Sequence, residues 1–399
     1  MRLAVWSIAV TIPLAACRLG FDAKDSPSDA SPDMAPDAQL PVLPCGAPTQ
    51  FAITLPPGGG SGSGSGSAVN PVPAIAATAT DGGYYVLAVD LAGNVHGLSY
   101  MFSGDAVAPA VTDAHVLDNA TGTVAALPVN GGVLASIVYG LPDATGTALV
   151  PLDAALEPRG DVQRYTAWFG SDGTMARAAD GTLAFLGETT DIAAKLVSPD
   201  GASLGAEHTV IDRNESAREP TITASDTGFL VTWSAGVASP DEVHAAIFDK
   251  QLAAPVVHTT IINPSPMFDG QTARASYAAG PDLYLFVWWF KTSMSDEVWV
   301  SLRNGSLGEI RAVQLTKRGK FPKVIAGAKD FLVVWQDLDS ASGLGAARVG
   351  FNASAQPLIV SGSGGTMLAW DVVSRAGQPA LIWFEDAASP TVWLDPLCN

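Results

Sequence analysis

The sequence is short of charged residues, and of basic ones in particular. Charged residues make up 15% of the chain, and 21 Lys and Arg face 39 Asp and Glu, for a formal charge of −18. Nucleic acids and anionic membrane surfaces are bound by neutralising phosphates with Lys and Arg. This balance therefore argues against nucleic acid as a partner and favours solubility.

Metal-ligating and nucleophilic motifs are also scarce. The five histidines, His96, His115, His208, His244 and His258, include no pair at the spacing of His-Glu-x-x-His, and there is no cluster of cysteines. No Gly-x-Ser-x-Gly elbow, phosphate-binding glycine loop or dinucleotide fingerprint stands between a strand and a helix. We expect no catalytic residue, no metal and no cofactor, and we interpret the protein as a non-enzyme.

A hydrophobic run long enough to span a membrane permanently is missing as well. The apolar stretch Leu3 to Leu14 is too short for a membrane helix, and Arg2 gives it the positive start of an export signal. It ends in the tetrapeptide Leu-Ala-Ala-Cys17, which resembles the lipobox of bacterial lipoproteins. The resemblance implies a signal peptide over residues 1–16 and a lipid on Cys17. An ordinary secretory signal followed by an incidental cysteine is the alternative.

The residues after the lipobox are typical of a tether. Arg18 follows the cysteine, where enteric lipoproteins retained in the inner membrane carry Asp, so we expect anchoring in a bacterial outer membrane. Residues 17–44 are rich in Asp, Pro and Ser. Repeated prolines exclude a regular helix and like charges extend the chain, which predicts a semi-rigid spacer between the lipid and a folded domain.

A short apolar motif recurs along the rest of the chain. Its clearest copies are Phe229–Trp233, Leu285–Trp289 and Phe331–Trp335, and weaker copies are Tyr85–Val89, Val133–Ile137, Leu183–Gly187 and Ala380–Phe384. Seven copies at a period of about fifty residues suit the four-stranded blades of a propeller. We therefore predict an all-β fold over residues 45–399, a seven-bladed β-propeller, with six or eight blades left open.

Each copy lies among three further apolar runs separated by turn residues. The runs around Trp335 are Phe321–Ile325, Phe331–Trp335, Ala346–Phe351 and Pro357–Val360. The second run is apolar on both faces, as expected of a strand buried between two neighbouring sheets. The pattern resembles the Val-Val-Trp repeats of bacterial secreted and lipoprotein propellers, most of which have no assigned activity. Ile137 and Gly187 depart from the Trp position of that pattern.

The two ends of the repeat region complement each other. The last repeat offers an inner strand at Trp370–Arg375, a second at Ala380–Phe384 and a third at Thr391–Leu397, but no outer strand. Gln50–Leu55 precedes the first repeat and has the character of an outer strand. We predict that residues 50–55 complete the last blade and so close the ring without an exposed edge.

One polar feature repeats with the blades. Arg218, Arg274 and Lys320 each lie fifteen residues before a Trp of the motif, at the entry to a predicted innermost strand. Basic groups at one mouth of the channel could bind an anion or an acidic partner. Acidic loop residues on the same face offer the alternative of mutual ion pairs: Asp241, Glu242, Asp296, Glu297, Asp337, Glu385 and Asp386. Calcium at Asp337, Asp339 and Ser342 competes with a simple Asp-rich turn.

The leading functional hypothesis is a lipid-anchored, monomeric binding or scaffold propeller whose ligand is a protein or a glycan. The main alternative is a carbohydrate-active propeller enzyme, which requires a pair of carboxylates in the channel. A purely structural envelope protein is a third possibility. No motif identifies the ligand.

Lipidation of Cys17 leaves Cys45 and Cys398 as a pair, and we predict a disulfide between them because exported proteins seldom keep free thiols. The bridge would close a loop of more than three hundred residues. In the chain-entropy model it contributes on the order of 4 kcal/mol or more. Intact-mass analysis with and without reductant should show the bond, and Cys398→Ser should lower the free energy of unfolding accordingly. Free sulfhydryls at both positions would contradict this.

Overall fold

The computed structural model describes residues 53–54, 74–90, 93–103, 106–112, 120–140, 145–166, 168, 174–188, 191–211, 218–235, 242–262, 269–291, 295–340, 342–360, 366–386, 391–395 and 397. These residues contain strands and turns and no helix, so none of them forms a helix that could cross a membrane.

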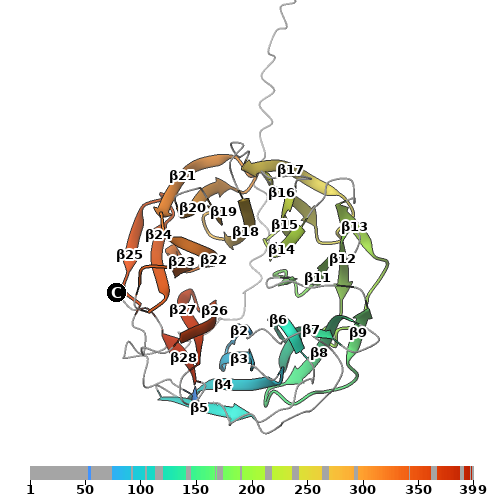
Figure 1. Ribbon diagram of the computed structural model, residues 1–399. Coiled ribbons are helices and arrows are strands. Elements are labelled where there is room, and N and C mark those ends of the chain that lie inside the picture. The colour runs from blue at the N-terminus through green and yellow to red at the C-terminus, as the bar shows by residue number, and fades with distance from the viewer. Residues whose placement is uncertain are drawn as a thin grey trace, which may run out of the picture. The chain divides into compact units, whose positions relative to one another are not determined.

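Seven four-stranded antiparallel sheets form a ring, one sheet for each predicted blade (Figure 1). Blade 1 contains β2 (Ala74–Thr80), β3 (Gly83–Val89), β4 (Val95–Ser103) and β5 (Ala106–Thr112); blade 2 contains β6 (Ala120–Val129), β7 (Gly132–Gly140), β8 (Thr145–Asp153) and β9 (Gln163–Thr166); blade 3 contains β10 (Met175–Arg177), β11 (Leu183–Glu188), β12 (Ile192–Val197) and β13 (His208–Ile211). Blade 4 contains β14 (Arg218–Ala224), β15 (Gly228–Ala235), β16 (Glu242–Asp249) and β17 (Pro255–Ile262); blade 5 contains β18 (Asp269–Ala278), β19 (Leu283–Lys291), β20 (Asp296–Asn304) and β21 (Glu309–Thr316). Blade 6 contains β22 (Gly319–Ala326), β23 (Asp330–Asp337), β24 (Leu344–Gly350) and β25 (Ala355–Leu358); blade 7 contains β26 (Thr366–Arg375), β27 (Gln378–Asp386), β28 (Thr391–Asp395) and β1 (Ile53–Thr54).

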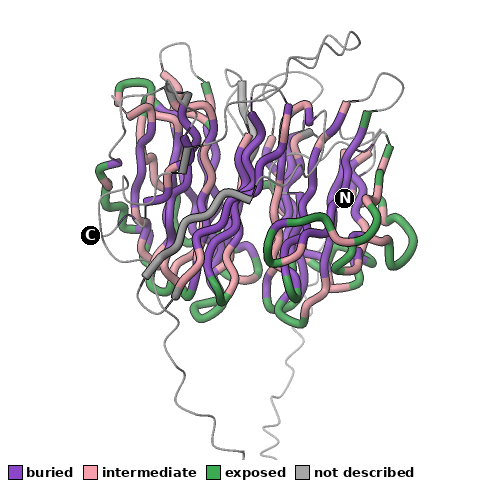
Figure 2. The backbone as a smooth tube through the Cα atoms, turned by 90° about the horizontal axis from the view of Figure 1, so that it is seen from below, coloured by how far each residue is buried: buried purple, intermediate pink, exposed green. Residues whose placement is uncertain are grey.

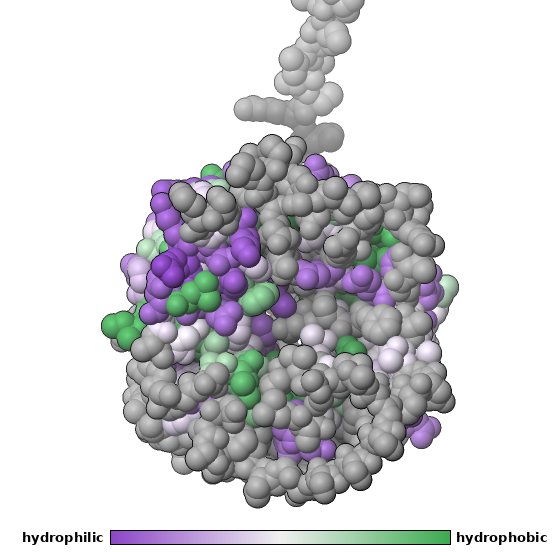
Figure 3. Space-filling view, in the orientation of Figure 1, coloured by the Kyte–Doolittle hydropathy of each residue, from purple (hydrophilic) through white to green (hydrophobic). Residues whose placement is uncertain are grey.

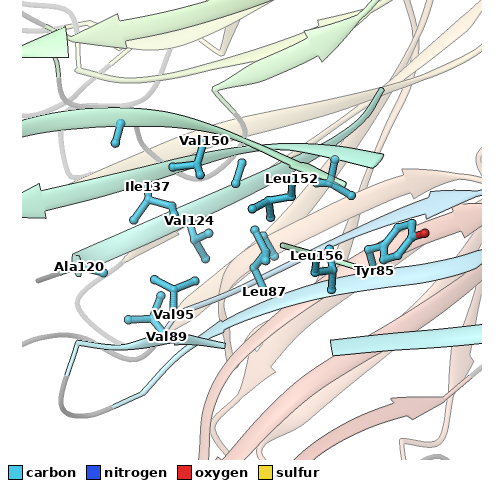
Figure 4. Packing of buried hydrophobic residues seen from close by; sticks show 14 of the residues in the cluster. Tyr85, Leu87, Val89, Val95, Ala120, Val124, Ile137, Val150, Leu152 and Leu156 are labelled. Atoms are coloured by element: carbon cyan, nitrogen blue, oxygen red, sulfur yellow. The ribbon is translucent and has the colours of Figure 1, made fainter. Parts of the chain in front are cut away.

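The second strand of each blade is buried on both faces, as its apolar sequence predicts. Every residue of β3 and of β15 is buried, and burial is concentrated in the strands while the turns at one end are exposed (Figure 2). The faces of these strands form separate clusters with the two neighbouring blades. Leu87 of blade 1 packs with Ile137 and Val150 of blade 2 in one such cluster (Figure 4). The core is therefore a series of seams between sheets.

The ring closes as the two chain ends predict. Ile53 pairs with Val392 and Thr54 with Thr391, so β1 is the outer strand of blade 7. The seven-bladed fold is confirmed. Cys17, Cys45 and Cys398, together with the signal peptide and tether, lie outside the described residues, so lipidation and the disulfide stay predictions.

Strand register corrects part of the repeat alignment. The second strands of blades 4, 5 and 6 each carry a tryptophan whose side chain packs against the preceding blade: Trp233, Trp288 and Trp335. Each lies four residues after the start of its buried run, and we call this residue the core tryptophan of its blade. The expected marker Trp289 is one residue too late and faces blade 6 instead. In blade 7 the equivalent residue is Trp383, one before the expected Phe384. The error arose because two adjacent large apolar residues occur there and the sequence does not say which face each one occupies.

Blade 3 replaces the missing Trp of the motif with one from another place in the chain. The indole of Trp168, which follows β9, lies directly over Gly187, and a Cβ atom there would collide with it. Trp168 is buried and packs against Tyr165 and Phe185 at ring-centroid distances of 5.8 and 5.4 Å. Its carbonyl accepts a hydrogen bond from Thr147 Oγ1 at 2.8 Å. Gly187 is thus the counterpart of a large side chain supplied from blade 2.

In blades 2, 4 and 5, the turn between the third and fourth strands carries a repeated motif that was not recognised in the sequence. Leu156, Leu252 and Leu307 occupy equivalent positions with φ of 64, 59 and 64°, and all three side chains are buried. An Asp or Asn three residues earlier accepts backbone N–H bonds and so holds the turn, as Asp153 Oδ1 does at 2.8 and 3.0 Å. Burial of the leucine stabilises a backbone conformation that branched or bulky residues otherwise avoid.

The seam between blades 7 and 1 contains a buried arginine. Arg375 lies 4.2 Å from the ring centroid of Phe102 and donates hydrogen bonds to the carbonyls of Thr80 and Asp81. Beside it, the hydroxyls of Tyr84 and Tyr100 are buried without a hydrogen-bond partner among the residues described. Burial raises the pKa of Tyr84 to about 12, partly opposed by Arg375, and raises that of Tyr100 further.

Trp168→Ala should lower the free energy of unfolding by about 3–5 kcal/mol, because it empties the space over Gly187. Leu204→Ala, at a side chain that is 63% exposed, is the matched control and should stay within about 0.5 kcal/mol of the parent. Urea denaturation measures both. Equal effects of the two variants would refute the packing role of Trp168.

The two seam tyrosines predict a loss of stability at alkaline pH. Their pKa values are raised in the folded state, so between pH 10 and 12 the unfolded chain gives up protons that the folded chain retains, and the free energy of unfolding falls as pH rises. Tyr84→Phe with Tyr100→Phe should flatten this dependence and cost little at pH 7. Denaturant midpoints between pH 7 and 11.5 test it, and an unchanged slope would be contrary to expectation.

Candidate functional site

The innermost strands of blades 4 and 6 bulge where they face the core tryptophan. In β14, Glu219 and Pro220 are inserted opposite Trp233, and in β22, Phe321 and Pro322 are inserted opposite Trp335. Glu219 and Phe321 have φ of 50 and 49°, the left-handed region that side chains rarely adopt. Such a bulge redirects the chain and aims a side chain away from the sheet.

Phe321 is directed into the channel mouth by this bulge. Its side chain is 49% exposed, and its ring meets that of Trp289 edge-on at 5.2 Å. A bulky residue that is both strained and half exposed gains little from burial, so packing alone does not explain why the position holds Phe. Strained backbone of this kind is concentrated at binding and catalytic sites.

Two adjoining cavities occupy the channel. The first, of about 350 Å³, is lined by the entry ends of the inner strands and includes Trp289, Phe321 and Trp370 together with Gln336. The second, of about 220 Å³, lies deeper and is lined by residues from all seven inner strands. Arg274 and Lys323 line both, so the cavities share part of their wall. Figure 3 shows the ring hollowed at its centre, with hydrophilic and hydrophobic side chains next to each other over blades 5 and 6.

Three charged residues meet at one level of the channel. Arg274, Lys323 and Asp371 each pair with the residue that precedes the core tryptophan of blades 5, 6 and 7. Lys323 Nζ lies 3.2 Å from Asp371 Oδ1, and Asp371 Oδ2 accepts the backbone N–H of Ala77 in blade 1 at 2.8 Å. Two cations and one carboxylate therefore line the described wall at this level.

The three residues predicted from sequence do not share one position. Arg218 and Lys320 pair with the residue after the core tryptophan, where blade 5 has Gln271, so Arg274 lies three residues deeper. Lys320 forms an ion pair with Asp296 at 3.4 Å and lies 5.7 Å from the ring centroid of Trp289. The side chain of Arg218 is outside the described part of the structure. Of the three, Arg274 lines the cavities.

Several other acidic residues named from the sequence contact polar neighbours. Glu242 contacts His244 at 3.0 Å, Glu297 accepts from Trp299 and Glu385 from Trp383. The residues considered for calcium have the contacts of an Asp-rich turn. Asp337 Oδ1 accepts the backbone N–H of Asp339, and the carboxylate of Asp339 forms an ion pair with Arg318 at 2.8 Å. No group of three or more His, Cys, Asp or Glu among the described residues could hold a metal ion.

Phe321 and Lys323 were missed because the sequence was searched for basic residues at a fixed spacing. A usable signal was present: Lys320-Phe-Pro-Lys323 matches Arg218-Glu-Pro-Thr221, each with a Pro just before an apolar inner strand. Proline has no N–H to donate and is confined to edges and bulges of sheets. Two such prolines at equivalent sites indicate the bulge, and an aromatic residue before one of them indicates the exposed ring.

No family model matches the chain, and no curated protein matches it. Among solved structures it is similar to the polysaccharide lyase Uly1, with a TM-score of 0.53 and 9% identity over 84% of this chain and 91% of that one. It is also similar to the Dos1 propeller (TM-score 0.49, 11% identity, 84% and 83% covered) and to the six-bladed lectin of Aleuria aurantia (0.44, 10%, 75% and 97%). At these identities the likeness shows the propeller fold alone.

Proposed function

We propose that this protein is a lipid-anchored bacterial envelope or surface protein that acts as a non-enzymatic binding propeller, with its ligand bound at the channel mouth beside Phe321. The observation that carries the proposal is the strained, half-exposed ring of Phe321 at a cavity of about 350 Å³. That volume lies within the range of about 300–1,000 Å³ typical of small-molecule sites, and the lining combines aromatic rings with a few polar groups, as such sites do.

The lipobox-like Leu-Ala-Ala-Cys17 and the Asp/Pro/Ser-rich residues 17–44 support the anchored location. A tether of this composition holds a domain away from the membrane, which leaves the channel mouth accessible to molecules in the surrounding medium. The formal charge of −18 favours a free domain over one adsorbed on anionic lipid.

Binding without turnover fits the channel better than glycoside hydrolysis. The two-carboxylate mechanism needs a pair of acids on either side of the bond that breaks. Among the described residues that line the two cavities, Asp371 is the one carboxylate, and its oxygens hold Lys323 and the N–H of Ala77. An acid already engaged in this way is poorly suited to act as a general acid or nucleophile.

Phe321→Gly should abolish ligand binding without destabilising the protein. Glycine adopts φ of 49° freely, and the relief of about 1–2 kcal/mol of left-handed strain offsets the lost contact with Trp289. The full-length protein in detergent is screened on glycan and protein arrays, and the variant is then compared with the parent for every ligand found. Thermal unfolding reports stability.

Glu219→Gly is the matched control, because it relieves the same strain at the equivalent bulge of blade 4 without removing an aromatic ring. It should leave binding intact. If every ligand binds the Phe321→Gly variant with the same affinity as the parent, the proposed site is refuted. If the arrays yield no ligand, a purely structural role is favoured. If the protein releases product from a glycan, the enzyme hypothesis is favoured.

A further inference from the structure

A further cavity lies at the end of the ring opposite the channel mouth. The inner strands begin at the mouth, and the turns at the far ends of β14 and β18 contribute Thr227 and Asp282 to this cavity. Its volume is about 490 Å³. We call it the blade 4–5 groove, because the third and fourth strands of blade 4 and one turn of blade 5 supply its other lining residues: Ile247, Phe248, Asp249, Val256, Val257, Asn304, Gly305 and Ser306.

One wall of the groove is apolar and open to solvent. Val256 and Val257, near the start of β17, supply this wall, and the side chain of Val256 is 70% exposed. Its apolar surface stays in water in the folded protein and therefore contributes little to stability. An alkyl chain laid over this wall would remove that surface from water.

Two carboxylates border the groove, and the cations nearest to them along the chain are engaged elsewhere. Lys250, which follows Asp249, contacts Asp180 of blade 3 at 2.8 Å, and Arg303 pairs with the glutamate that begins β21 at 3.0 Å. Within the described residues, no ion pair involves Asp249 or Asp282. The groove is therefore negative and has no counter-charge from the described part of the chain.

A tyrosine hydroxyl brings a third carboxylate to the same place. The hydroxyl of Tyr277 lies 2.9 Å from Asp282 Oδ1 and 3.3 Å from Asp226 Oδ2. A hydroxyl has one proton, so it donates to one of these carboxylates at a time. Burial, the hydrogen bond to Asp282 and the negative charges of both carboxylates raise the pKa of Tyr277. Like charges are thus held close together beside the groove, and a cation would relieve their repulsion.

The strand that borders the groove has an unprotected edge. β17 is the outer strand of blade 4; it carries no Asp, Glu, Lys or Arg, and its proline, Pro255, is at the first position. Two other outer strands are protected, β21 by Glu309 and Arg311 and β5 by Pro109 in its middle. Edge charges and internal prolines prevent pairing with another chain. β17 is therefore suited to pair with an extended segment.

Charge and shape together identify the occupant. A metal ion does not fit, since the described residues contain no group of three or more His, Cys, Asp or Glu that could hold one, and an ion would leave Val256 uncovered. A second copy of the chain would bring a further formal charge of −18, which opposes self-pairing. A lysine side chain fits both parts of the groove, because its apolar stem can cover the valines while its ammonium group meets the carboxylates.

We propose that the blade 4–5 groove is a second binding site, which docks an extended, lysine-bearing segment of a partner protein. The segment pairs with the edge of β17, the stem of one lysine packs on Val256 and Val257, and its ammonium group binds Asp249 and Asp282. This site is independent of the ligand at the channel mouth, because the groove and the mouth lie at opposite ends of the ring.

Full-length protein in detergent is titrated with the fluorescein-labelled peptide Thr-Val-Thr-Lys-Thr-Val-Thr, and fluorescence anisotropy reports binding. The same peptide with norleucine in place of lysine keeps the apolar stem without the charge and should bind roughly tenfold more weakly. Spermidine carries ammonium groups on alkyl stems but has no peptide backbone to pair with β17. It should displace the labelled peptide roughly tenfold less effectively than unlabelled peptide does.

Asp249→Asn and Asp282→Asn should each weaken binding of the lysine peptide about three- to fivefold, the effect expected of an exposed charge pair, and leave the norleucine peptide unchanged. Asparagine keeps the side-chain oxygen that accepts hydrogen bonds, as Asn304 does in the equivalent turn of blade 5. It also tolerates the φ of 53° at position 282.

Asp153→Asn is the matched control. It removes the same charge from the equivalent turn of blade 2, where Asp153 Oδ1 accepts the same kind of backbone hydrogen bonds, and it does not line the groove. It should bind the lysine peptide like the parent. Circular dichroism verifies folding, and if one groove variant does not fold, the other decides.

Equal affinity for the lysine and norleucine peptides would overturn the proposal, as would groove variants that bind the lysine peptide like Asp153→Asn. If spermidine displaces the labelled peptide as effectively as unlabelled peptide does, the groove binds a small polyamine and the assignment of a protein segment is wrong.

Discussion

The pairing of β1 with β28 is the contact on which the rest of the structure depends. A ring of seven sheets buries its second strands only if each sheet has a neighbour on both sides, and blade 7 would present an open edge without Ile53 and Thr54. The closure brings residues from opposite ends of the chain together, so its entropic cost is high. Arg375 adds hydrogen bonds between blades 7 and 1, and Arg348 of blade 6 donates to the carbonyl of Leu397 at 2.9 Å.

The candidate site depends on this closure because it lies on the inner strands. Asp371 of blade 7 connects Lys323 of blade 6 to the backbone of Ala77 in blade 1. This polar contact of the channel wall therefore crosses the seam between blades 7 and 1. The strain at Phe321 persists only because the surrounding sheets fix the bulge. Rigid inner strands therefore position the ring and the cations, whereas in many proteins loops do so.

Much of the fold could be predicted from the sequence because buried strands between sheets are apolar on both faces and recur at a constant interval. The four runs predicted around Trp335 correspond to β22, β23, β24 and β25, with ends that differ by a few residues. Prediction failed where two large apolar residues are adjacent. Trp288 and Trp289 are equally apolar, and which one faces the preceding blade depends on strand pairing, which composition does not encode.

By itself, the sequence determined the seven repeats, the four strands in each and the need for residues 50–55 to complete the last blade. Hydrophobic periodicity is a local property of the sequence, and a last repeat that lacks its fourth strand is recognised by counting strands. Only the tertiary structure decided which side chains share the channel. Arg274 and Lys323 are equivalent although their distances to the chosen Trp markers differ, since the hairpin of β18 and β19 is one residue longer on each strand than that of β22 and β23 and the marker Trp289 lies one residue past Trp288. In the same way Trp168 fills the space at Gly187 from another blade, which no spacing along the chain could indicate.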